Sequence, residues 1–254
     1  MNILTIENLT HSYSERKLFD DTSFSIEEGE KVGIIGINGT GKSTLLNIIA
    51  GNIVPDEGKV TIANKVIIEM LSQHPSFEDN ETVIHYVMTD VPKDEDMFAV
   101  EAEAKAMLQT FGITDYDELT CHMSGGQRKK IALVRALLSG ADILILDEPT
   151  NHLDNEMSTW LENYLKDYKK SVIIVTHDRY FLDSVSDRIV ELDKGKIYSY
   201  KTNYSVFQAR LLQVLCQIRQ PAHNPSIRPH TVLTCHFQMQ KFFVPLCQEN
   251  ICHG

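Results

Sequence analysis

The feature that most constrains this chain is the run GINGTGKST, which covers residues 36–44. It fits the pattern G-x-x-x-x-G-K-[ST], with Gly36, Gly41, Lys42 and Ser43 at the fixed positions. A short apolar run comes before it, and apolar residues at helical spacing follow. The pattern therefore lies between an expected strand and an expected helix, which is the context that a phosphate-binding loop requires.

The expected strand covers residues 31–35, and the following helix carries Leu45, Leu46, Ile48 and Ile49 on one face. Glycines let the backbone approach a phosphate chain closely, and the helix N-terminus presents free N–H groups to the anion. Lys42 would reach the outer phosphates and Ser43 would ligate Mg²⁺. The alternative is a chance glycine-rich turn, which the four fixed positions and the flanks disfavour. We therefore expect a nucleoside triphosphate site.

Composition narrows the class of protein. The chain has 254 residues, a hydrophobic fraction of 43% and a formal net charge of −11. The acidic balance argues against broad electrostatic capture of nucleic acid or of an anionic membrane. No apolar run approaches the roughly 18 residues that a membrane helix needs, and the start MNILTIENLT has no signal-peptide pattern. We expect a cytoplasmic protein without membrane insertion.

Cysteine usage agrees with that expectation. Of five cysteines, only Cys121 lies within the first 215 residues, so a disulfide framework for the main body is excluded.

The second informative stretch is MSGGQRKKIALVRALL, residues 123–138. Ser124 followed by Gln127 is a capping-box pattern, and apolar residues at helical spacing come next. The pattern places Gly125 and Gly126 at a positive helix N-terminus. This is either a second anion-binding site or an ordinary helix start.

The third stretch begins with the continuous apolar run ILIL, residues 143–146, which suits a parallel strand buried on both faces. Asp147 and Glu148 follow at its carboxyl end, where α/β sheets place ligands. Asp147 would hold Mg²⁺ through water, and Glu148 would orient or deprotonate an attacking water. A solvated acidic turn is the alternative. A further β-branched strand is expected over 172–175, and His177 follows at its carboxyl end, as Asp147 does at the end of its strand.

The remaining pattern is typical of a mixed α/β chain. Strands are expected over 1–7, 18–26, 60–62 and 66–71, helices within 81–110 with a break at Pro92, and a hairpin from 189–192 and 196–200. An apolar helical stripe at Met157, Trp160, Leu161, Tyr164 and Leu165 predicts core packing. Tyr13 lies in an expected polar loop, where it either stacks on a nucleotide base or is an ordinary surface residue.

Taken in order, GINGTGKST, Gln73, MSGGQ, ILILDE, NHLD and His177 strongly resemble the ATP-binding cassette (ABC) ATPases over residues 2–208. The resemblance implies an α/β P-loop NTPase fold with a mainly parallel central sheet, an antiparallel β subdomain and a small helical subdomain. The ATP-binding domain would cover 1–204 and its helical subdomain about 80–140.

The resemblance also implies roles for particular residues, with ATP and Mg²⁺ as cofactors. Tyr13 would stack on adenine, Gln73 would sense the γ-phosphate and Mg²⁺, and Asp154 would couple two sites. The SGGQ signature would grip the γ-phosphate of ATP that a second cassette holds. The implied cofactor-binding residues are Tyr13, Gly36, Asn38, Gly39, Thr40, Gly41, Lys42, Ser43, Thr44, Ser124, Gly125, Gly126, Gln127 and Asp154. The implied catalytic residues are Lys42, Gln73, Glu148 and His177, and the implied metal ligands are Ser43, Gln73 and Asp147.

Two motifs, EPTNHLD (148–154) and HDRYFLD (177–183), look like the ABC-F branch, and the chain is similar to the first cassette of its Uup-like members. That branch implies two cassettes on one chain and, for many members, action on ribosomes in translation or antibiotic resistance. Two alternatives stay open. One is the ATPase subunit of a membrane ABC transporter, which commonly has EPTSALD-like residues. The other is a non-catalytic regulatory fragment that pairs with an intact protein.

The end of the chain departs from the family pattern. Residues 205–220 look like the start of a linker helix, and from 221 the composition changes to proline, histidine and cysteine with a single acidic residue. We expect a divergent, disordered tail over 221–254 that replaces the linker and the second cassette. The alternative is a zinc site, whose candidate ligands are Cys235, His236, Cys247, Cys252 and His253.

Overall fold

The computed structural model describes residues 1–13, 16–71, 75–77, 81–92 and 95–209. The chain divides into two compact units, Met1–Asn203 and Tyr204–Gly254. The described part of the second unit, residues 204–209, is helical. Most of the expected linker helix, and all of the expected tail with its candidate zinc ligands, lie outside the described residues.

A six-stranded sheet forms the centre of the first unit. Its strands, in spatial order, are β5 (Ile68–Leu71), β6 (Ile143–Asp147), β7 (Ser171–Val175), β3 (Lys31–Gly36), β8 (Arg188–Asp193) and β9 (Lys196–Tyr200). The first five strands pair in parallel, and β9 pairs antiparallel with β8. Every residue of β6, β7 and β8 is buried. Strands β6 and β7 are largely apolar, as strands covered on both faces require, whereas β8 also carries the buried charged residues Arg188, Glu191 and Asp193.

A second, antiparallel sheet has the order β2-β1-β4. Its strands are β1 (Asn2–Tyr13), β2 (Arg16–Glu27) and β4 (Glu57–Ile62). Strand β1 continues well past the expected end at Glu7, so the placement of Tyr13 in a loop was wrong, because Tyr13 is the last residue of this strand. The alternation that predicts a strand breaks at Asn8, whose φ is 51°, where the register against both neighbours shifts.

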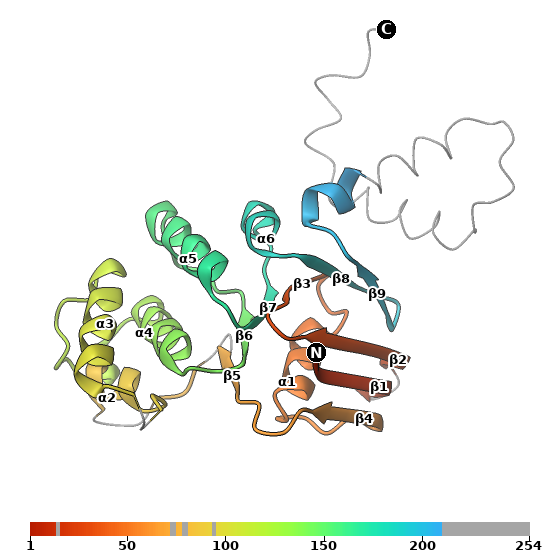
Figure 1. Ribbon diagram of the computed structural model, residues 1–254, viewed down its shortest axis with the longest axis horizontal. Helices are drawn as coiled ribbons and strands as arrows, with labels where there is room; N and C mark the ends of the chain where they lie inside the picture. Colours follow the sequence, from red (N-terminus) through yellow and green to blue (C-terminus); the bar gives the residue numbers. More distant parts are fainter. Residues whose placement is uncertain (14–15, 72–74, 78–80, 93–94, 210–254) are drawn as a thin grey trace, which may run out of the picture. The chain divides into compact units, whose positions relative to one another are not determined.

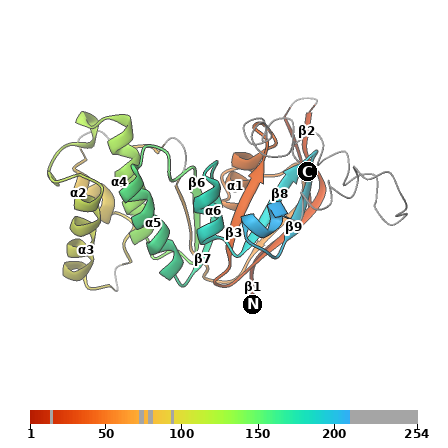
Figure 2. The same ribbon diagram turned by 90° about the horizontal axis from the view of Figure 1, so that it is seen from above.

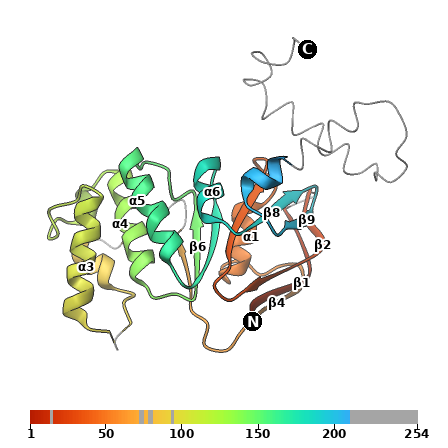
Figure 3. The same cartoon turned by 45° about the horizontal axis from the view of Figure 1, so that its top comes forward.

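The two sheets share a core with helix α1 (Lys42–Ile49). Leu45, Leu46, Ile48 and Ile49 of this helix are fully buried among apolar residues of β1, β2, β3 and β6. Figure 3 shows α1 between the antiparallel sheet and the parallel one. This packing fixes the phosphate loop, because the loop joins the end of β3 directly to the start of α1.

Helices α2 (Val83–Met88), α3 (Met97–Thr110) and α4 (Gly125–Leu138) gather at the end of the first unit opposite the antiparallel sheet (Figures 1 and 2). Side chains cap the first turns of α2 and α3, because Thr82 accepts from the His85 N–H and Asp96 accepts from the Phe98 N–H. The helical pattern expected within 81–110 is therefore present as two helices, with Pro92 in the connection between them.

Helices α5 (Asn155–Asp167) and α6 (Arg179–Val185) lie on the other side of the parallel sheet from α1 (Figure 1). Within the stripe expected on α5, Leu161 and Leu165 are fully buried. Trp160 makes a T-shaped contact with Phe111, with ring centroids 5.3 Å apart, and stacks on Tyr164. The stripe thus packs α5 against the segment that follows α3.

The predicted fold class is confirmed: the protein is α/β, with a mainly parallel sheet, an antiparallel sheet and helices. In the part of the chain that the structure describes, no helix combines the length and the hydropathy needed to cross a membrane.

Candidate nucleotide-binding site

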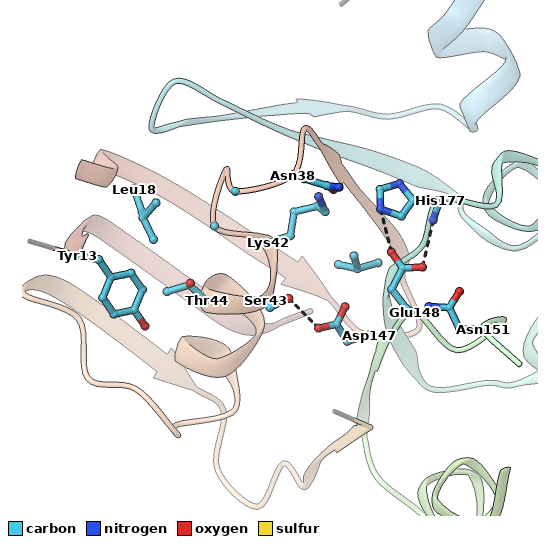
Figure 4. A pocket seen from close by; sticks show the side chains of 13 residues that line it. Tyr13, Leu18, Asn38, Lys42, Ser43, Thr44, Asp147, Glu148, Asn151 and His177 are labelled. Atoms are coloured by element: carbon cyan, nitrogen blue, oxygen red, sulfur yellow. Dashed lines mark hydrogen bonds and ion pairs between the residues drawn. The ribbon is translucent and has the colours of Figure 1, made fainter. Parts of the chain in front are cut away.

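A cleft of about 640 Å³ opens where β3, β6 and β7 end at their carboxyl edge (Figure 4). Its lining residues are Tyr13, Leu18, Asn38, Gly39, Gly41, Lys42, Ser43, Thr44, Asp147, Glu148, Asn151, Val175 and His177. Residues from the phosphate-loop pattern, from the acidic strand end and from the histidine strand end therefore share one cavity. The loop lies more than a hundred residues before the other two stretches in sequence, and all three meet because their strands are neighbours in the sheet.

The loop between β3 and α1 is held by its own backbone and by close packing. The Thr40 hydroxyl donates to the Ile37 carbonyl at 2.9 Å. Gly41, the N-cap of α1, has φ 100°, and a Cβ there would lie 3.0 Å from Phe19 Cζ of β2. A side chain at this position would strain the backbone and disturb the packing of the loop on the antiparallel sheet.

Lys42 points its ammonium group back into the loop. Its Nζ donates to the carbonyl oxygens of Gly36 at 2.8 Å and Ile37 at 3.3 Å. Partial burial lowers the pKa of Lys42 from its ordinary value, and the nearby carboxylates of Glu148 and Asp147 oppose that shift. The loop thus holds a cation beside the space that the glycines leave for phosphate oxygens.

Ser43 and Asp147 form the oxygen-rich part of the cleft. The Ser43 hydroxyl donates to Asp147 Oδ2 at 2.8 Å, and Asp147 is buried at the end of β6. A hydroxyl and a carboxylate are hard oxygen donors of the kind that Mg²⁺ prefers, particularly where phosphates complete its coordination. The donor set therefore fits the predicted metal.

Glu148 has an unusual backbone and a fixed carboxylate. Its φ is 54°, and its N–H donates to the Val175 carbonyl of β7 at 2.7 Å. His177 holds the side chain twice, because its backbone N–H donates to Glu148 Oε2 at 3.3 Å and its Nε2 lies 3.3 Å from Oε1. The Glu148 side chain is 7% exposed and the His177 side chain 60% exposed. Strain of this kind collects where the surrounding structure must aim a side chain.

Tyr13 and Leu18 lie at the end of the cleft away from Glu148 and His177 (Figure 4). Leu18, Asn151 and Val175 line the cleft but were not predicted from the sequence. Asn151 belongs to the EPTNHLD motif and could have been found there, whereas nothing in the pattern around Leu18 or Val175 distinguishes them from ordinary core residues.

The family described as ABC transporter matches residues 19–151 of this sequence, which is more than half of the chain and includes the phosphate loop, the SGGQ stretch and Glu148. The chain belongs to the ABC transporter family of ATP-binding domains.

Curated relatives of this ABC domain include the uncharacterized ABC transporter ATP-binding protein YfmR of Bacillus subtilis, which is 40% identical over 87% of this chain and 41% of its own length. The energy-dependent translational throttle protein EttA of Mycobacterium tuberculosis (strain CDC 1551 / Oshkosh) is 33% identical over 81% of this chain and 43% of its own length. The ATP-binding protein Uup of Haemophilus influenzae is 34% identical over 82% of this chain and 37% of its own length. The chain spans about two fifths of the length of these relatives.

A solved structure described as the ATP binding subunit of an ABC transporter shares the fold. Its TM-score is 0.73 at 20% identity, and the match covers 92% of this chain and 99% of that one.

The ABC signature residues lie apart from this cleft. Ser124 is the N-cap of α4, where it accepts from the Gln127 N–H and forms the predicted capping box. The side chain of Arg128 fastens this start of the helix, because its Nε donates to the Thr120 carbonyl at 2.9 Å and its Nη2 to the Cys121 carbonyl at 3.0 Å. Among the described residues that line the cleft, none comes from Ser124, Gly125, Gly126 or Gln127.

Four further predicted residues do not line the described cleft. Asp154 is the N-cap of α5 and accepts from the Met157 N–H at 2.9 Å. Gly36 and Thr40 stabilise the loop through its internal hydrogen bonds: the Gly36 carbonyl accepts from Lys42 Nζ, and the Thr40 hydroxyl donates to the Ile37 carbonyl. Gln73 lies outside the described residues. The predicted roles of all site residues stay predictions.

Proposed function

We propose that this ABC cassette is of the ABC-F type, binds ATP together with Mg²⁺, and hydrolyses ATP when a second cassette completes its site. The observation that carries the proposal is the single cleft that holds the glycine loop with Lys42, the Ser43–Asp147 pair and the Glu148–His177 pair. These are the positioning, charge-stabilising and water-activating parts that phosphoryl transfer to water needs.

Each group has one task in this proposal. Ser43 and Asp147 would hold Mg²⁺, which supplies neutralising charge for the phosphates. Lys42 would place its ammonium against the outer phosphate oxygens. Glu148 would take the proton of the attacking water through its fixed carboxylate, and His177 would keep that carboxylate aimed into the cleft.

The partner in the proposal is a second ABC cassette, supplied by another copy of this chain or by another protein. Support comes from the signature: its N–H groups open the helix α4, where they suit an anion, yet they do not line the cleft of their own chain. A pair of cassettes arranged head to tail would bring each signature to the other's cleft, and a twofold axis permits that arrangement.

The ABC-F assignment rests on EPTNHLD and HDRYFLD, and it agrees with the likeness to Uup and to a translational throttle protein. We therefore propose that the protein acts in the cytoplasm on the translation machinery and that its binding partner there is the ribosome. Asn151 and His152 disfavour the transporter-subunit alternative, whose family pattern usually has EPTSALD-like residues at this point.

The Glu148→Gln protein tests the proposal directly. This change preserves side-chain shape but removes the base, so hydrolysis should fall by about 10²- to 10⁴-fold while ATP stays bound. Measured by light scattering, the solution mass should double from the 28.8 kDa of one chain when MgATP is added. Glu156→Gln, on an exposed residue in the first turn of α5, is the matched control and should hydrolyse as the unmodified chain does.

Two results would contradict the proposal. Full turnover by a dilute sample that remains monomeric would show that the signature is not needed from a second cassette. Undiminished turnover by Glu148→Gln would show that this carboxylate is not the base.

A further inference from the structure

The end of strand β1 carries a buried histidine beneath the exposed tyrosine of the cleft. His11 is 6% exposed, whereas Tyr13 is 53% exposed and lines the cleft. Residues two apart on a strand share a face, and the two rings meet edge to face, with centroids 5.1 Å apart and planes at 81°. The imidazole therefore supports the tyrosine ring from within the protein.

Asp56 fixes this histidine and the backbone beside it. The Ser12 N–H donates to Asp56 Oδ2 at 2.8 Å, and His11 Nδ1 lies 3.5 Å from Asp56 Oδ1. Within the described chain, neither ring nitrogen of His11 makes a hydrogen bond, so its contact with Asp56 is electrostatic. One carboxylate thus binds the peptide N–H between His11 and Ser12 and lies beside the His11 ring.

Gly58 brings Asp56 close enough to do this. Its φ is 93°, and a Cβ there would lie 2.5 Å from the carbonyl oxygens of Glu7 and Asn8 on β1. The start of β4 can therefore approach β1 this closely only with glycine at this position. None of these contacts belongs to the phosphate loop or to the acidic end of the cleft.

We propose that His11, held by Asp56, is a positioning residue that sets the Tyr13 ring for stacking on the base and so makes the cassette select nucleotides over bare phosphate chains. The proposal rests on the proposed ATP-binding function and extends it to the recognition of the base. An exposed tyrosine loses rotamer freedom when it stacks on a ligand. The edge contact with His11 restricts that ring in the free protein, which lowers the cost of binding.

The experiment compares two ligands, MgATP and magnesium tripolyphosphate, by calorimetric titration. His11→Ala removes the supporting ring, and we expect it to weaken MgATP binding by about two- to tenfold, the worth of one edge-to-face contact. Tripolyphosphate affinity should not change, because the phosphate loop is untouched. His11→Phe keeps a ring at the same place and should restore MgATP affinity.

Asp56→Asn is a second test variant, in case His11→Ala does not fold. It retains the buried His11 ring but weakens its anchor, so it should reduce MgATP affinity in the same direction and again leave tripolyphosphate unaffected. Equal weakening of both ligands would overturn the proposal, since it would show a general loss of structure. Unchanged MgATP affinity in His11→Ala and Asp56→Asn, or no recovery in His11→Phe, would also overturn it.

Tyr13→Ala separates this proposal from the proposed function. If Tyr13→Ala weakens MgATP binding and the His11 variants do not, only the positioning role of His11 is wrong. If Tyr13→Ala itself leaves MgATP affinity unchanged, the stacking of Tyr13 on the base, which the family resemblance implies, is wrong. If the unmodified chain does not bind MgATP, the proposed nucleotide site itself is wrong.

Discussion

Gly41 and Gly51 lie at the two ends of helix α1, and both have a left-handed backbone, with φ values of 100° and 79°. Their surroundings differ. A Cβ at Gly41 would lie 3.0 Å from Phe19 Cζ, whereas a Cβ at Gly51 would have no described atom within 4 Å. Alanine at Gly51 would therefore strain only the backbone, whereas alanine at Gly41 would also disturb the packing of the phosphate loop against Phe19.

We predict that Gly41→Ala and Gly51→Ala each lower the free energy of unfolding by about 1–2 kcal/mol, because alanine is strained at positive φ. Only Gly41→Ala should also weaken MgATP binding, since its methyl group would press against Phe19 and Leu18 and displace the phosphate loop. Urea unfolding and nucleotide titration on the same samples measure the two effects. Equal affinities in both variants would refute the proposed role of the loop.

At the scale of elements, two tyrosine hydroxyls fasten α5 to the end of α4 and the loop after it. The Tyr168 hydroxyl donates to the Ala141 carbonyl at 2.9 Å, and the Tyr164 hydroxyl donates to the Leu137 carbonyl at 3.4 Å. Burial raises the pKa of each tyrosine from 10.0 to about 12. Both residues must therefore stay protonated for the helix to keep these contacts.

This shift predicts how stability depends on pH. Because the folded-state pKa lies above the unfolded value, the stabilisation is complete below pH 10 and is lost as the pH rises from 10 towards 12. Tyr168→Phe should reduce the slope of unfolding free energy against pH in that window. Tyr198→Phe, on an exposed tyrosine of β9, should leave the slope unchanged. Equal slopes in the two variants would contradict the prediction.

The sequence predicts the elements of this chain unevenly, for physical reasons. Buried strands such as β6 and β7 have continuous apolar runs, and α4 begins with a capping box that the structure confirms. The length of β1 was missed because the positive φ of Asn8 interrupts the alternation, although the backbone pairing continues. Helix α6 has only seven residues, too few for a clear helical period.

At the scale of the whole first unit, Arg188 joins strands that are distant in sequence. From β8, its Nη1 donates to the Ser25 carbonyl at 3.0 Å and to Glu30 Oε1 at 3.1 Å, and its Nε donates to the Ser199 hydroxyl at 2.6 Å. The guanidinium also lies over the ring of Phe24, 5.2 Å from its centroid. A single buried cation thus ties the parallel sheet to the antiparallel one.

We predict that Arg188→Met destabilises the fold by about 3–5 kcal/mol, because it leaves the mostly buried Glu30 carboxylate without its counter-charge. The double variant Arg188→Met with Glu30→Gln should recover part of that loss. Lys17→Met, which breaks an exposed pair with Asp20, is the control and should not shift the urea midpoint measurably. A loss in Arg188→Met no greater than in the control would refute the prediction.

The location of the candidate site follows from topology at this scale. Gly36, Asp147 and His177 could be brought together from sequence because each lies at or just after the carboxyl end of a strand, and these ends face the same edge of a parallel sheet. Leu18 and the His11–Asp56 contact could not, since they depend on how an antiparallel sheet with an irregular register packs beside that edge. The base-binding end of the cleft is therefore the part that needed the structure.

The contact between Trp160 and Phe111 has a practical consequence. The chain has one tryptophan, and its indole lies between α5 and the segment after α3, with Lys130 of α4 donating to the Phe111 carbonyl at 3.2 Å. Any turning of α3 and α4 relative to α5 would change the surroundings of this one fluorophore. The protein therefore carries its own optical reporter of domain movement, readable in the intact chain without a label.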